Sequence, residues 1–101
     1  MTKKDKKRGL KFMKAIVTVS GKDTTGIIAA ICTLLSENNV NILDISQTVM
    51  EEFFTMSMLV DTSKSKKGVA ELASELDGLG KKMGLVIHTQ REDIFTLMHR
   101  V

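Results

Sequence analysis

The chain has 101 residues, 43% of them hydrophobic, and a single cysteine. This length supports one domain with one core, and the lone Cys32 permits neither an internal disulfide nor a multi-cysteine zinc site. No apolar run approaches the roughly 20 residues that cross a bilayer, and the basic start lacks the apolar stretch of a signal peptide. We therefore expect one cytoplasmic domain with no membrane partner.

The positive charge of the chain is concentrated at its start. Residues 1–12 hold five lysines and one arginine against Asp5, a net charge of +5; the whole chain carries +3, so residues 13–101 carry −2. We expect 1–12 to be a solvated, disordered tail, whether native, derived from cloning or upstream of a start at Met13, and 13–101 to form the domain. The body has no Trp or Tyr to stack on bases, which disfavours nucleic acid as a partner.

The first half of the domain reads as strand, helix, strand. Alternating apolar residues over Met13–Ser20 predict a half-buried strand. Apolar positions three and four residues apart predict a helix over Thr25–Asn38, which Asn38 and Asn39 end. Asn41–Met50 then predicts a strand with one wet face. Its apolar face carries Leu43, Ile45 and Val49, interrupted by Gln47.

The second half reads as strand, helix, strand, helix. A polar turn at Glu51 and Glu52 joins the second strand to an alternating strand over Phe53–Asp61, which predicts a hairpin. Helical spacing follows over Val69–Met83, then a short strand over Leu85–Thr89. A third helix over Glu92–Val101 closes the predicted chain.

This order predicts an α+β, ferredoxin-like βαββαβ fold with an extra C-terminal helix over 92–101. Right-handed crossovers place two helices on one face of a four-stranded antiparallel sheet. The uncovered face mixes polar and apolar residues, and we expect a homodimer, formed either face to face or side by side through the second and fourth strands at the edges. The residues expected on this face are Ile16, Thr18, Asp44, Ser46, Thr48, Thr55, Ser57 and Leu59.

The turn over Ser20–Ile27 is the strongest candidate for a binding site. Its two glycines allow the backbone to approach a ligand or a neighbouring strand, while Asp23, Thr24 or Thr25 is suited to cap the helix that follows. Free amides at a helix start carry partial positive charge, which suits a carboxylate or phosphate. The alternative interpretation is a capped turn that binds nothing.

Two segments together carry a resemblance to a known family. Lys14–Ile27, with its Gly-x-Asp-x-x-Gly-Ile turn, followed by Asn41–Gln47, resembles the ACT domain, and the resemblance extends from residue 13 to about 90. The stretch Asp44–Val49, with Phe53–Met56 after it, is most similar to small stand-alone bacterial and archaeal ACT proteins, which are related to the ACT modules of the glycine cleavage system repressor.

The resemblance implies a regulatory module that binds a small molecule, commonly an amino acid, at an interface between two domains and so acts on a partner protein. It implies that Asp23 holds the ligand's ammonium, that the backbone of Gly26 and Ile27 holds its carboxylate, and that Asn41 adds a side-chain amide. We expect no cofactor. The expected binding residues are Asp23, Thr24, Thr25, Gly26, Ile27, Asn41 and Ile42.

Two other functions stay open. One is a purely structural dimerisation or adaptor module that binds no ligand. The other is a small enzyme like the acylphosphatases, which share this fold; their anion loop needs an arginine near the first helix, and this chain has none there. No spacing among Cys32, His88 and His99 resembles a metal site, so we expect neither a metal nor an enzyme.

Overall fold

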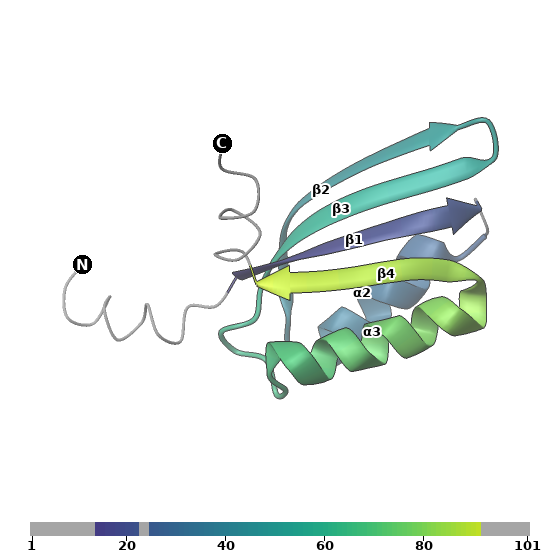
Figure 1. The fold of residues 1–101 in the computed structure, drawn as a ribbon. Helices are drawn as coiled ribbons and strands as arrows, with labels where there is room; N and C mark the ends of the chain where they lie inside the picture. The colour runs from purple at the N-terminus through teal and green to yellow at the C-terminus, as the bar shows by residue number, and fades with distance from the viewer. Residues whose placement is uncertain (1–13, 23–24, 92–101) are drawn as a thin grey trace.

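The computed structural model describes residues 14–22 and 25–91. The predicted tail over 1–12 and the predicted helix over 92–101 lie outside these residues, as do Asp23 and Thr24. The elements follow the predicted βαββαβ order, which is therefore confirmed (Figure 1). They are β1 (Lys14–Lys22), α2 (Ile27–Glu37), β2 (Asn41–Met50), β3 (Phe53–Asp61), α3 (Val69–Met83) and β4 (Leu85–Arg91).

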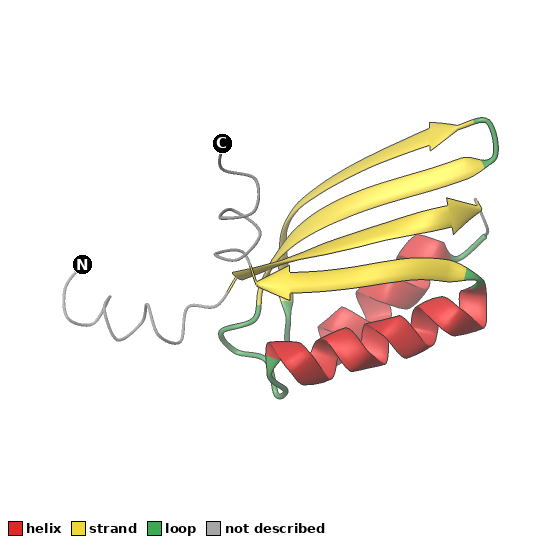
Figure 2. Cartoon of the chain, viewed as in Figure 1, coloured by secondary structure: helices red, strands yellow, loops and turns green. Residues whose placement is uncertain are grey.

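The four strands form one antiparallel sheet in the order β2-β3-β1-β4. The edge strands are thus β2 and β4, as predicted. Both helices lie on the same face of this sheet, so the opposite face carries no helix (Figure 2). Neither helix in the described ranges is long and apolar enough to cross a membrane.

The core lies between the sheet and the two helices. Alternate residues of the central strands β1 and β3 point into it, because successive side chains of a strand face opposite sides. Each large aliphatic side chain buried there contributes about 1.5–3 kcal/mol to folding. The largest fully buried residues are Ile31, Leu35, Met58, Leu72, Leu76, Val17, Val19 and Val60.

Two element boundaries differ from the prediction at the candidate turn. β1 continues to Lys22 because Gly21 and Lys22 still pair with β3. α2 begins at Ile27 instead of Thr25, because Gly26 occupies the N-cap with φ +86° and ends the helical geometry. The helix stop is confirmed, since Asn38 is the C-cap and Asn39 has a positive φ of 61°.

The prediction that the apolar face of β2 is covered is wrong. Ile45 and Val49 share a face with the buried residues Met58 and Phe54 of β3, yet they are 39% and 51% exposed. The helices therefore leave β2 uncovered on the side where they shield β3. A bulge also interrupts the pairing at Leu43, between Ile42 and Asp44, which explains why the predicted alternation fails there.

Candidate functional site

Gly26 shapes the start of α2. Its φ of +86° lies in the left-handed region that glycine adopts without strain, and an added Cβ would meet nothing within 4 Å. Its carbonyl accepts the Ala30 N–H at 2.9 Å, while the first backbone amides of the helix have no intrahelical acceptor. Backbone conformation, and not close packing, is therefore why glycine stands here. The N-cap position is thus held by a residue without a side chain, and not by Asp23, Thr24 or Thr25, the residues predicted to cap the helix.

Gly21 has a different role. A Cβ at this position would lie 2.8 Å from Leu85 Cδ2 and 3.1 Å from the carbonyl oxygen of Gly84. The glycine therefore permits β1 to approach the turn that leads into β4. Of the two roles considered for the pair of glycines, Gly21 serves the neighbouring strand.

The other residues predicted around the turn differ in accessibility. Thr25 is exposed, whereas the side chain of Ile27 is buried in the core at 3% exposure. Only the backbone of Ile27 is thus available to a ligand. Ile28, at 38% exposure, is the nearest exposed apolar side chain on the helix.

Asn41 lies at the other end of α2. The helix ends at Glu37, and the Val40 N–H donates to the Leu35 carbonyl at 2.9 Å, which holds the connection into β2. An eleven-residue helix is roughly 16 Å long at 1.5 Å per residue. A single chain therefore does not bring Asn41 next to Gly26. Ile42, the last predicted residue, is half-buried and packs against the core.

A shallow hollow of about 490 Å³ borders Asn41. It lies between the end of α2, the start of β2 and the loop after β3, and its lining is largely polar. The lining residues are Ser36, Asn39, Val40, Asn41 and Lys64.

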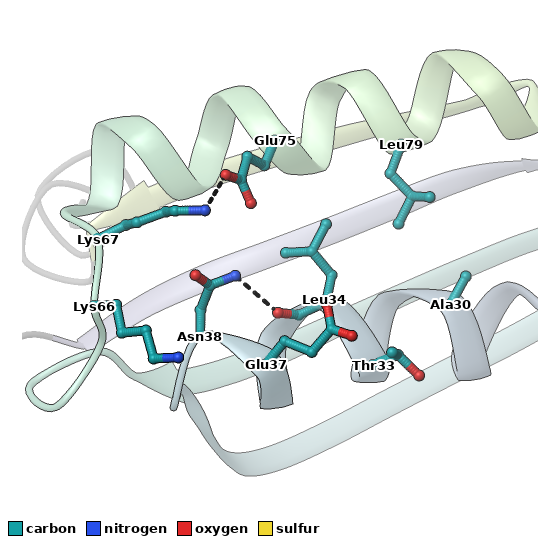
Figure 3. Close-up of a pocket in the computed structure, with 9 residues that line it drawn as sticks. All are labelled: Ala30, Thr33, Leu34, Glu37, Asn38, Lys66, Lys67, Glu75 and Leu79. Carbon is teal, nitrogen blue, oxygen red and sulfur yellow. Dashed lines mark hydrogen bonds and ion pairs between the residues drawn. The ribbon is translucent and has the colours of Figure 1, made fainter.

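A second hollow, which we call the α2–α3 groove, was not predicted from the sequence. It has a volume of about 480 Å³ and lies between the two helices and the loop that precedes α3 (Figure 3). Its two lysines, Lys66 and Lys67, lie in a loop whose sequence has no periodic pattern, so the sequence did not indicate them as site residues. Its lining is Ala30, Thr33, Leu34, Glu37, Asn38, Lys66, Lys67, Glu75 and Leu79.

An ion pair crosses one end of the α2–α3 groove. Lys67 Nζ donates to the carboxylate of Glu75 on α3 (Figure 3). This hydrogen bond, and the charges of Glu75, Glu71 and Glu37, raise the pKa of Lys67 above its ordinary value of 10.5, against a smaller opposing effect of desolvation. The pair fastens the loop to the first turns of α3.

The described residues offer little for catalysis. Across 14–22 and 25–91 no three His, Cys, Asp or Glu side chains gather as a metal site. His88 is exposed on β4, and Cys32 is half-buried against the core. Arg91 pairs with Ala15 at the end of β1 opposite the candidate turn. Arg91 therefore does not supply the arginine that an anion loop like that of the acylphosphatases needs near this turn.

Comparison with known proteins identifies the family. The family model of the ACT domain matches residues 14–90. A UPF0237 protein of Bifidobacterium longum is 51% identical over 88 residues, which are 87% of this chain and 98% of that protein. Both findings cover most of the chain.

Solved structures agree with the fold. An ACT domain protein from Streptococcus pneumoniae superposes with a TM-score of 0.73 and 42% identity, over 83% of this chain and 94% of that one. A protein named as a glycine cleavage system transcriptional repressor superposes with a TM-score of 0.68 over 78% of this chain and 45% of that one; its 23% identity shows likeness of fold alone. The predicted resemblance is confirmed: the chain belongs to the ACT domain family.

Proposed function

We propose that this chain is a regulatory module that binds a small amino acid at an interface between two copies paired side by side through β2. The observation that carries the proposal is the state of this edge strand. β2 has ten residues, a free hydrogen-bonding edge and exposed apolar side chains. Those side chains are Leu43, Ile45, Val49 and Met50.

An exposed apolar edge favours pairing with a second strand, because pairing satisfies the backbone and buries the side chains together. A two-fold axis makes the same strand meet itself in antiparallel orientation. Such a pairing extends the four-stranded sheet to eight strands. It also gives Ile45 and Val49 the cover that the helices do not provide.

The pairing also has a consequence for the predicted site. Met50 pairs with Phe53, and Phe53 pairs with Lys22, so the end of β2 lies at the end of the sheet where β1 runs into the Gly26 turn. An antiparallel partner strand brings its own Asn41 to that same end. Within one chain, Gly26 and Asn41 lie at opposite ends of α2. In the proposed dimer, Gly26 of one chain and Asn41 of the partner subunit contribute to the same site.

Within this arrangement the proposed roles follow the family resemblance. The backbone amides of Gly26 and Ile27 receive the ligand's carboxylate, since free amides at a helix start favour an anion. Asp23, which lies outside the described residues, holds the ammonium, and Asn41 of the partner subunit donates a side-chain hydrogen bond. Thr24 and Thr25 border the ligand beside Gly26, and Ile42 of the partner subunit borders it beside Asn41.

The test combines a thermal-shift screen of the twenty amino acids with sizing of the full chain. A ligand at a hundred times its Kd stabilises by about 2.7 kcal/mol, which raises the Tm of a domain of this size by roughly 10–20 °C. We expect at least one amino acid to raise the Tm of a dimer, and Asn41→Ala to remove the rise. A monomer, or no shift at millimolar concentration, contradicts the proposal.

A second candidate is the purely structural dimerisation module. The exposed apolar edge of β2 favours it equally, because dimerisation through this edge needs no ligand. The two functions differ in one measurement: ligand-linked tightening of the dimer, followed by sedimentation, supports the regulatory module and counts against the structural one.

A further inference from the structure

We infer that the α2–α3 groove is a second ligand site, which takes a small zwitterion with an aliphatic body. The groove extends along α2 from Ala30 to Asn38, and its polar end, at Glu37, Asn38 and Lys66, lies at the end of the helix away from the Gly26 turn. Its volume of about 480 Å³ falls within the roughly 300–1,000 Å³ of small-molecule sites. This site goes beyond the proposed function and does not depend on dimerisation.

A buried amide without a full set of partners faces the groove. Asn38 is only 6% exposed, and its Nδ2 donates to the Leu34 carbonyl at 3.0 Å. Because that acceptor fixes the amide's orientation, the remaining atom is the oxygen Oδ1, and no donor among the described residues bonds to it. Figure 3 shows this oxygen on the side of the loop lysines. This oxygen is an acceptor that a ligand with a hydrogen-bond donor can use.

The charges around Asn38 favour a ligand with one charge of each sign. Glu75 neutralises Lys67. In the part of the chain that the structure describes, the ammonium of Lys66 and the carboxylate of Glu37 have no ion-pair partner. The groove thus presents one unpaired cation and one unpaired anion. A molecule with a carboxylate and an ammonium complements both groups. A dianion would be repelled by the carboxylate of Glu37, and a dication by the ammonium of Lys66.

The rest of the lining is aliphatic. Leu34 and Leu79 are partly buried against the core, and Ala30 continues this strip along α2 (Figure 3). An aliphatic group laid over the strip loses contact with water while the charged end of the molecule stays near Asn38. The chemical class is therefore an aliphatic amino acid, and L-leucine is the probe.

The loop wall of the groove is held in place before any ligand arrives. The Lys66 N–H donates to the Asn38 carbonyl at 3.1 Å, which fixes Lys66 beside the buried amide. Ser65 Oγ donates to the Lys67 carbonyl at 2.7 Å and accepts the Lys67 N–H at 3.0 Å. Because this wall is already ordered, binding a ligand costs less conformational entropy.

The test is a titration of the full, isotope-labelled chain with L-leucine, followed by the amide resonances. We expect shifts at Lys66, Leu79 and the Asn38 side-chain amide. N-acetyl-leucine and leucinamide each lack one charge and should bind about tenfold more weakly, the loss expected for one charge-assisted hydrogen bond. Lys66→Met and Glu37→Gln should weaken L-leucine binding similarly, while the matched surface variants Lys64→Met and Glu52→Gln should not.

The outcomes separate this site from the proposed one. Shifts around Lys66 and Asn38 that persist in Asn41→Ala support the groove, even where the turn binds nothing. Shifts confined to Gly26, Ile27 and Asn41 overturn it, as does the absence of shifts at millimolar L-leucine. Leucinamide and N-acetyl-leucine that bind as tightly as L-leucine also overturn it, because the charges would then have no role.

Discussion

Gly26 and Asn41 lie at opposite ends of α2, with the whole of Ile27–Glu37 between them. The two residues are only a short stretch of sequence apart, but the helix keeps them roughly 16 Å from one another. Any small ligand that touches both must therefore be held by two chains. The predictions below test the conformations and surfaces on which this arrangement depends.

Gly26→Ala should destabilise the domain by about 1–2 kcal/mol, because the φ of +86° is strained for a residue with a Cβ. Space is not the cause, since a Cβ there meets nothing within 4 Å. Gly78→Ala is the matched control: it also has free space but lies in α3 without a positive φ, and it should stabilise by about 0.4–1 kcal/mol. Urea denaturation measures both; equal effects would show that φ is not the reason.

Gly21→Ala should cost about 1–3 kcal/mol through overpacking against Leu85, whose Cδ2 lies 2.8 Å from the added Cβ. Leu85→Ala removes that atom but leaves the Gly84 carbonyl. In a double-mutant cycle the two substitutions should therefore cost less together than the sum of each alone. Strict additivity would mean that β1 does not approach β4 as closely as described.

Val49→Lys should dissociate the proposed dimer while leaving the fold intact. Val49 is 51% exposed on the edge strand, so the monomer tolerates a charge, but pairing through β2 would remove an unpaired ammonium from water, which costs several kcal/mol. Val86→Lys, on β4 at 57% exposure, is the matched control and should leave the dimer unchanged. Sedimentation distinguishes the two. A dimer lost in Val86→Lys alone would point to the other edge or the open face.

The ion pair of Lys67 and Glu75 should stabilise the fold only below strongly alkaline pH. The folded-state pKa of Lys67 lies above its ordinary value of 10.5, so the stabilisation is fully present below 10.5 and is lost as the pH rises through the higher folded value. The difference in urea midpoint between the wild type and Lys67→Met should therefore shrink across this range. Lys64→Met, on the exposed part of the same loop, is the matched control for loss of a loop lysine outside the pair. A constant difference for Lys67→Met would contradict the role of the pair.

Most of the fold was predictable because its periodic patterns are strong. The alternation of β1 and β3 and the spacing of α2 and α3 each identify a buried face. The state of β2 was not predictable, because alternation marks an apolar face without showing whether a helix reaches it. Ile45 and Val49 therefore looked like core residues, although they lie at an uncovered edge.

The candidate site was predictable only in part. The resemblance led to Gly26 and Asn41, but the helix between them separates the two in one chain. The α2–α3 groove was missed because its parts come from distant segments: Asn38 ends one helix, Lys66 lies in a loop, and Leu79 belongs to the other helix. Only the tertiary fold places these three side chains around one space.

The most direct test of the central claim is complementation between two inactive chains. For an amino acid that does not bind in the α2–α3 groove, Asp23→Ala and Asn41→Ala should each abolish binding by their own homodimers. A purified heterodimer of the two carries one intact shared site, with Asp23 from one chain and Asn41 from the other, so calorimetry should find one ligand per heterodimer. A heterodimer that binds no ligand, while the wild type does, would contradict a site shared between subunits.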